Sequence, residues 1–176
     1  MKISEYLKGP IEPLKQRTLV FLIDKINNRI LLGHKKRGFG EGKLNGIGGK
    51  VEEGETVEQA AMREGFEEVG IEFGKLTRVA LLDFYFPYVD NPAKWNQQVV
   101  VYLCNRWHGH PIETEEIKPE WFPLNKVPHD QMWSDDVFWF PKVLEGSMIR
   151  AKFLFGKDLL VEDSEIQEVE NQNELF

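Results

Sequence analysis

Three glutamates near the middle of the chain have a spacing suited to binding a metal ion. Glu64, Glu67 and Glu68 lie three and four residues apart, so a helix would project all three carboxylates from one side. Like charges at this spacing repel by roughly 0.2–0.5 kcal/mol per pair in an isolated helix, and a multivalent cation would reverse that repulsion. Carboxylate oxygens, with water and substrate phosphate, are the ligands that Mg²⁺ prefers. The sequence therefore predicts a Mg²⁺ site, with Mn²⁺ as the alternative ion.

The residues around these glutamates favour a functional site over a solvated acidic helix face, which is the usual meaning of a charge run. A glycine-rich loop carrying Lys50 comes just before the helix, and a glycine backbone can approach phosphate closely. Arg63 stands four residues before Glu67, where its guanidinium can orient that carboxylate. Thr56 is the predicted N-cap of the helix, which we expect to extend to Val69.

This segment resembles the signature of the Nudix hydrolases. The residues that match it at the family's spacing are Gly49, Glu55, Arg63, Glu64, Glu67, Glu68, Gly70 and Ile71. Such a match would arise by chance on the order of once in a billion start positions, given average residue usage. One position departs, because Gly65 stands where the family usually has an aliphatic residue. Glycine inside a helix costs about 1 kcal/mol relative to alanine. Since Gly65 follows Val57 and Ala61 on one side of the helix, we expect it to pack closely against a neighbouring element.

The resemblance implies a metal-dependent hydrolase that acts on nucleoside diphosphates linked to another group. It implies metal ligation by the Gly48 carbonyl, Glu64, Glu67, Glu68 and Glu116, and catalytic roles for Arg63, Glu67, Glu68 and Glu116. Glu68 and Glu116 are both candidates for the general base, and either could instead be only a metal ligand. The resemblance also implies an α/β sandwich in which helices flank a mixed sheet.

Two stretches outside the signature bear on the substrate, residues 35–46 and residues 132–141. They resemble the MutT-type branch of the family, which hydrolyses oxidised purine nucleoside triphosphates such as 8-oxo-dGTP to the monophosphate and pyrophosphate. That activity removes damaged nucleotides from the pool and belongs to DNA repair. The substrate-binding residues that the resemblance implies are Thr18, Lys35, Phe39, Asn45, Lys50, Phe84, Trp133, Asp135 and Asp136.

The chemistry of these side chains suits a purine. Phe39 and Trp133 offer flat faces, and stacking of a base on an aromatic ring is worth about 1–3 kcal/mol. Asn45 has both a donor and an acceptor for a purine edge. Asp135 and Asp136 are adjacent, so the charge of one raises the pKa of the other, and a protonated carboxyl beside an ionised one donates and accepts at once. The alternative for this pair is an acidic helix N-terminus that the helix dipole favours.

Two other functions remain open. The first is a Nudix pyrophosphohydrolase for another nucleotide, such as a dinucleoside polyphosphate, a nucleotide sugar, or a canonical or methylated purine triphosphate. The set of Asn45, Trp133, Asp135 and Asp136 argues against it. The second is a non-catalytic nucleotide-sensing module, which should have lost at least one metal carboxylate, and none is lost.

Composition limits the remaining possibilities. A chain of 176 residues with 41% hydrophobic residues is enough for one domain with a core, and we expect a single Nudix domain over residues 1–176. The net charge of −7 argues against a nucleic acid polymer as partner, although a nucleotide can arrive with Mg²⁺. Without an apolar N-terminal segment or a long apolar span, we expect neither export nor membrane insertion. We therefore expect a cytoplasmic monomer whose single cysteine, Cys104, packs in the core.

The elements that would position these residues follow from the apolar patterns. We expect strands over residues 18–23, 29–34, 76–86, 97–104 and 119–123, with a final hairpin over 153–161. We expect a second helix from Asp135 to Leu144 capped by Ser134, with Phe138, Trp139 and Phe140 in the core. Residues 1–16 should form a surface extension, and the polar tail from residue 167 should be frayed. Strands interleaved with two helices indicate an α/β fold.

Overall fold

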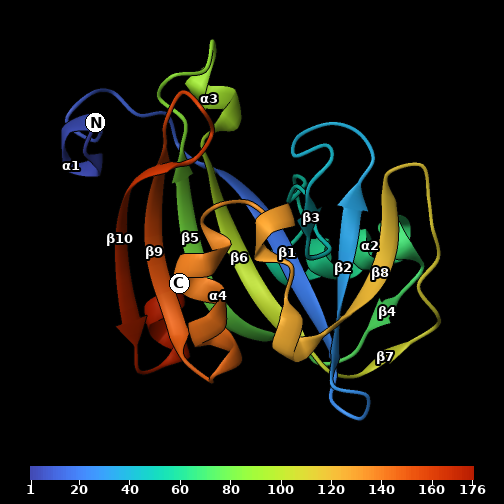
Figure 1. The fold of residues 1–176 in the computed structure, drawn as a ribbon. Coiled ribbons are helices and arrows are strands. Elements are labelled where there is room, and N and C mark those ends of the chain that lie inside the picture. Colours follow the sequence, from blue (N-terminus) through green and yellow to red (C-terminus); the bar gives the residue numbers. More distant parts are fainter. The chain divides into compact units, whose positions relative to one another are not determined.

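The computed structural model describes residues 1–176, which form two compact units (Figure 1). The first unit comprises Met1–Arg17, Val79–Val100 and Ser134–Phe176. The second comprises Thr18–Arg78 and Val101–Trp133. None of the helices combines the length and the apolar character needed to cross a bilayer.

Strands are interleaved with helices along the chain, as the sequence predicts. The helices are α1 (Ile3–Tyr6), α2 (Val57–Val69), α3 (Pro92–Trp95) and α4 (Asp136–Leu144). The strands are β1 (Lys15–Asp24), β2 (Arg29–Lys35), β3 (Leu44–Asn45), β4 (Glu72–Phe73), β5 (Thr77–Tyr85), β6 (Gln97–Cys104), β7 (Trp107–His108), β8 (Ile117–Pro123), β9 (Met148–Phe155) and β10 (Val161–Val169). The α/β class with a mixed sheet is confirmed, because β5 pairs with β9 in parallel while β10 pairs with β9 in antiparallel.

The second unit is built around β2. The predicted hairpin is present, with Leu22 opposite Leu31 and Asp24 opposite Arg29. Asp24 closes the turn, because its carboxylate accepts hydrogen bonds from the side chains of Asn27 at 2.8 Å and Arg29 at 2.9 Å. Strand β2 also pairs in antiparallel with both β3 and β8. Cys104 lies in this unit and is buried, as predicted.

Helix α2 begins and ends where the sequence predicts. Thr56 is its N-cap, and its side-chain oxygen accepts a hydrogen bond from the Gln59 N–H at 3.1 Å while the Gln59 side chain bonds back to the Thr56 N–H. The predicted close packing of Gly65 is also confirmed. A Cβ at this position would overlap the ring of Phe73, which is buried on β4.

In the first unit, α4 packs against β9 (Figure 1). Trp139 and Phe140 are fully buried, as expected, but the expectation of a core position for Phe138 was wrong, because its side chain is 43% exposed. The buried residues of α4 are Asp136, Trp139, Phe140 and Val143, which have the spacing of one helix face. Phe138 lies off that face.

Three predictions at the edges of elements were wrong. Residues 1–16 are not only a surface extension, because Ile3 is fully buried against Tyr85 and Leu154. The tail is not frayed, since β10 extends to Val169 and a short 3₁₀ helix follows with Leu175 fully buried. Ser134 does not cap α4, because its hydroxyl accepts a hydrogen bond from the Val161 N–H at 3.0 Å.

Candidate functional site

Two adjacent glycines let the loop before α2 run close to its neighbours. A Cβ on Gly48 would overlap the backbone carbonyl of Thr18, and one on Gly49 would overlap the carboxylate of Glu64. The Gly49 carbonyl accepts a hydrogen bond from the Thr18 N–H at 2.9 Å, and the Gly48 N–H donates to Glu68 at 3.3 Å. Any side chain at either position would therefore push β1 or the carboxylates of α2 away.

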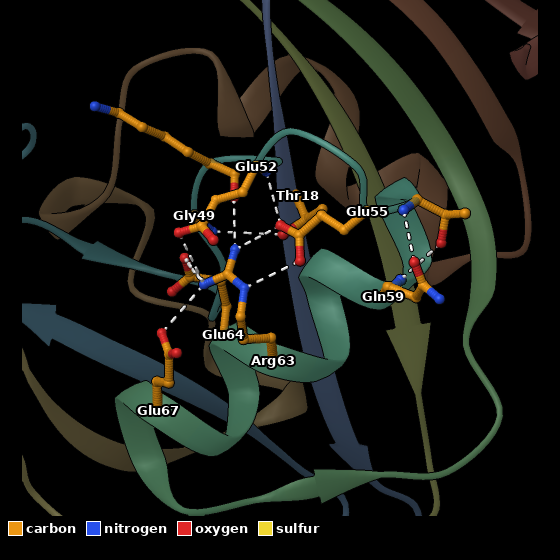
Figure 2. Close-up of polar contacts among 10 residues, drawn as sticks. Thr18, Gly49, Glu52, Glu55, Gln59, Arg63, Glu64 and Glu67 are labelled. Carbon is orange, nitrogen blue, oxygen red and sulfur yellow. Dashed lines mark hydrogen bonds and ion pairs between the residues drawn. The ribbon is translucent and has the colours of Figure 1, made fainter.

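Arg63 organises the acidic residues around this loop (Figure 2). Its guanidinium donates to both oxygens of Glu55, at 2.7 and 3.1 Å, and to Glu64 at 3.0 Å. It also donates to Glu67 at 3.1 Å, which confirms the predicted pair one helical turn apart. A further bond at 2.9 Å reaches the Lys50 carbonyl and ties α2 to the glycine-rich loop. Arg63 thus fixes the positions of three carboxylates at once.

Glu64 and Glu68 carry their charges at an energetic cost. Glu68 is only 5% exposed. Burial, the charge of Glu64 and the weaker influence of Glu116 raise the pKa of Glu68 to about 8, although Lys35 opposes this change. Burial also raises the pKa of Glu64, with the bond from Arg63 acting in the opposite direction. Glu67 is largely exposed. A cation near Glu64 and Glu68 would favour their ionised forms.

Glu116 lies on a second acidic loop that is tied to α2. The Thr114 hydroxyl donates to the Glu68 carbonyl at 2.8 Å, a contact that the sequence analysis missed. The carboxylate of Glu116 accepts a hydrogen bond from Arg37 at 3.0 Å and lies 4.0 Å from the Lys35 ammonium. Its charge contributes to the raised pKa of both Glu64 and Glu68. The four predicted metal carboxylates therefore belong to one electrostatic group.

The donor set suits a hard divalent cation in its chemistry but not in its present side-chain positions. All its members are oxygens, the atoms that such cations prefer. No group of three or more acidic, histidine or cysteine side chains converges on one point in the structure. Glu64 and Glu67 instead turn to Arg63, and Glu116 turns to Arg37. Binding of a cation would need these carboxylates to turn away from arginine.

The predicted base-stacking residues of the second unit contact each other. Phe39 stacks on Trp133, with ring centroids 5.2 Å apart and planes at 16°. Trp133 is only 9% exposed, and the Lys43 ammonium lies 5.1 Å from its ring. Asn45 is the last residue of β3, where its side-chain oxygen accepts a hydrogen bond from the Gly46 N–H at 2.9 Å. Its side-chain amide remains a donor for a ligand.

The predicted acid pair lies in the first unit and is buried. Asp135 and Asp136 are 4% and 2% exposed. Asp135 accepts a hydrogen bond from the Trp139 indole at 2.9 Å, and it makes no side-chain cap bond to α4. Burial raises the pKa of Asp135 to about 6. Burial and the charge of Asp135 raise the pKa of Asp136 well above its ordinary value. Each carboxyl of the pair therefore keeps its proton to a higher pH than an exposed aspartate does.

The other predicted substrate residues have more ordinary surroundings. Thr18 is buried on β1, and its hydroxyl accepts a hydrogen bond from the Gly49 N–H at 3.4 Å. The side chain of Lys50 is exposed, while Lys35 is partly buried at the end of β2. In the first unit, Phe84 stacks on Phe153 with ring centroids 5.7 Å apart.

Comparisons with known proteins agree with this architecture. The model of the NUDIX domain family matches residues 13–143. A *Danio rerio* protein named oxidized purine nucleoside triphosphate hydrolase is 41% identical over 158 residues, covering 89% of this chain and 97% of that protein. A *Mus musculus* protein of the same name is 39% identical and covers 88% of this chain and 95% of its own length. The crystal structure of a MutT protein from *Bacillus halodurans* has the same fold, with a TM-score of 0.76 at 21% identity, covering 88% of this chain and 98% of that one. With a glycine-rich loop, an acidic helix and a family match over most of its length, the chain belongs to the Nudix hydrolases.

Proposed function

We propose that this enzyme hydrolyses oxidised purine nucleoside triphosphates, such as 8-oxo-dGTP, to the nucleoside monophosphate and pyrophosphate. The observation that carries the proposal is the buried acid pair of Asp135 and Asp136, both with a raised pKa. The names of the *Danio rerio* and *Mus musculus* relatives, each matched over nearly its whole length, support the same substrate class.

The acid pair suits the edge of an oxidised purine. Guanine and its oxidised form both present a carbonyl acceptor and an amino donor on one edge, and an ionised carboxylate can only accept hydrogen bonds. Two coupled carboxyls that share one proton can donate to the carbonyl and accept from the amino group together. We assign this role to Asp135 and Asp136. The stacking roles go to Phe39, Trp133 and Phe84, and polar contacts with the substrate go to Thr18, Lys35, Asn45 and Lys50.

On the phosphate side, we assign ligation of Mg²⁺, or of Mn²⁺ in its place, to the Gly48 carbonyl, Glu64, Glu67, Glu68 and Glu116. When bound, the ion would neutralise charge on the phosphates and lower the pKa of bound water. Arg63 orients three of the neighbouring carboxylates, including Glu64 and Glu67. The products follow if water attacks a phosphorus of the triphosphate and the bond to the departing pyrophosphate breaks.

The general base is Glu68 or Glu116, and the two differ in their surroundings. Glu68 is buried and has a pKa raised to about 8, so positive charge must come near before it is ionised at neutral pH. Glu116 is about half exposed and forms an ion pair with Arg37. Separate replacement of each by glutamine distinguishes them, because only loss of the base removes the fall of kcat at low pH that protonation of the base causes.

A kinetic panel tests the proposed substrate. It compares kcat/KM for 8-oxo-dGTP, 2-hydroxy-dATP, O6-methyl-dGTP, dGTP and dATP, with a dinucleoside tetraphosphate and ADP-ribose as substrates of other Nudix classes. We expect the oxidised purines to exceed their normal counterparts by tenfold or more, since one unpaired buried polar group costs about 1–3 kcal/mol. Preference for ADP-ribose or the dinucleoside tetraphosphate would refute the substrate assignment. Absence of all turnover at saturating Mg²⁺ would favour a sensing module.

A further inference from the structure

We propose that Arg37 is a positioning residue that holds Glu116 away from cations until a base displaces Phe39 from Trp133. Base binding and cation binding would then be coupled through the loop of residues 36–42. This inference deepens the proposed function and rests on its assignment of Glu116 to the metal side and of Trp133 to the base side.

One end of the coupling is a set of ion pairs between two loops of the second unit. Arg37 donates to Glu116 at 3.0 Å and lies 3.8 Å from Glu115. The side chain of the adjacent Lys36 contacts different partners, since its ammonium donates to Glu113 at 3.0 Å and to the Thr114 carbonyl at 2.8 Å. The Lys36 backbone N–H donates to the Glu116 carbonyl at 2.8 Å. Arg37 is therefore the residue of this loop whose guanidinium forms an ion pair with the carboxylate of Glu116. A cation that binds Glu116 must compete with that guanidinium.

The other end of the coupling is the stack of Phe39 on Trp133. The rings are nearly parallel, and Trp133 is only 9% exposed. A base that stacks on this face of Trp133 must therefore take the place of Phe39. Only Gly38 separates Phe39 from Arg37 along the chain. A backbone shift at Phe39 would therefore also move Arg37, the residue that holds Glu116.

The loop is closed at its ends by backbone hydrogen bonds and contains three glycines with positive φ. Its ends are closed by hydrogen bonds from the Lys35 N–H to the Lys43 carbonyl at 3.0 Å and from the Gly42 N–H to the Lys35 carbonyl at 2.9 Å. Gly38, Gly40 and Gly42 have φ of +78°, +81° and +83°. A Cβ at Gly38 or Gly42 would meet no atom within 4 Å, whereas one at Gly40 would lie 3.2 Å from the indole nitrogen of Trp133. Because glycine accepts many backbone conformations, the loop can rearrange once the contacts of Phe39 with Trp133 are broken.

Linkage then makes the coupling reciprocal. If a base that displaces Phe39 weakens the Arg37–Glu116 pair, cations bind more tightly when a base is present, and the base gains affinity by the same factor when a cation is present. An exposed ion pair of this kind is worth up to about 1 kcal/mol, which corresponds to a change of about fivefold in affinity. The site would thus bind its cation best when the correct base is already bound.

A binding titration tests this coupling without turnover. Binding of Mn²⁺ to the full chain is followed by the electron paramagnetic resonance of free Mn²⁺, with and without saturating 8-oxo-2′-deoxyguanosine, a nucleoside that has no phosphate to chelate the ion. The wild type should bind Mn²⁺ about twofold to fivefold more tightly when the nucleoside is present. Arg37→Gln should show this tighter binding without the nucleoside, and adding the nucleoside should change it no further.

Lys36→Gln is the matched control. It removes a positive charge from the residue next to Arg37, and the Lys36 side chain does not contact the Glu116 side chain. Its Mn²⁺ affinity should stay within about twofold of wild type, since long-range effects of a surface charge are screened by salt, and its response to the nucleoside should persist. Equal shifts in the two variants, or a wild type whose Mn²⁺ affinity ignores the nucleoside, would overturn the inference. The substrate assignment fails separately, in the turnover panel.

Discussion

Replacing Asp135 with asparagine should stabilise the folded protein at neutral pH and weaken its selection of substrate. Burial raises the pKa of Asp135 from 3.8 to about 6, so the folded state keeps a proton that the unfolded chain releases between these values. At about 1.36 kcal/mol for each pH unit, the ionised carboxyl lowers the free energy of unfolding by about 3 kcal/mol once both states are ionised. Asparagine removes this loss, and its side-chain oxygen can still accept the bond from Trp139.

The sign of the pH dependence follows from the raised pKa. The wild-type contribution is fully present below the unfolded pKa of 3.8 and is lost as pH rises through the folded pKa of about 6. The stability difference between Asp135→Asn and wild type should therefore be close to zero near the lower value. It should reach about 3 kcal/mol in favour of the variant on the plateau above the higher value.

Urea unfolding over a range of pH measures this difference directly, and Asp24→Asn is a control with the opposite sign. Hydrogen bonds from Asn27 and Arg29 lower the pKa of Asp24 from 3.8 to about 2. Its contribution is present above 3.8 and is lost as pH falls toward 2, so Asp24→Asn should destabilise the protein at neutral pH. An Asp135→Asn variant less stable than wild type at neutral pH would refute the reasoning. The kcat/KM of Asp135→Asn for oxidised purine triphosphates should fall by about tenfold or more relative to wild type.

Three further outcomes follow from the geometry. Glu67→Gln and Glu68→Gln should each lower kcat by orders of magnitude while thermal melting remains cooperative, and excess chelator should abolish wild-type turnover. Gly65→Ala should destabilise the fold, because overpacking against Phe73 costs about 1–3 kcal/mol while the better helix propensity of alanine contributes about 1 kcal/mol. Urea unfolding measures this change, and activity per folded molecule should be unchanged. Ile3→Ala should lower the free energy of unfolding by about 2–5 kcal/mol in the same assay, as expected for a fully buried side chain.

The sequence predicted best where the determining contacts are local. The N-cap at Thr56 bonds to Gln59 only three residues on, and Arg63 meets Glu67 one helical turn later, so spacing alone was sufficient. The contacts that were missed join distant segments. Nothing near Ile3 in the sequence indicates that it packs on Leu154, and nothing near Ser134 indicates that Val161 takes its hydroxyl. Local pattern predicts such elements but not the partners that bury or redirect their ends.

The direction in which the pKa is shifted distinguishes Glu55 from Glu64 and Glu68. The bonds from Arg63 lower the pKa of Glu55, as expected for a carboxylate whose charge is already compensated. Glu64 and Glu68 behave in the opposite way, since burial and repulsion from neighbouring carboxylates raise the pKa of each even though Arg63 bonds to Glu64. Such buried, like-charged carboxylates do not help the helix to fold, because each one lowers the stability of the folded state when it is ionised. Glu55 therefore suits the task of holding Arg63, whereas Glu64 and Glu68 suit a cation that the chain itself does not provide.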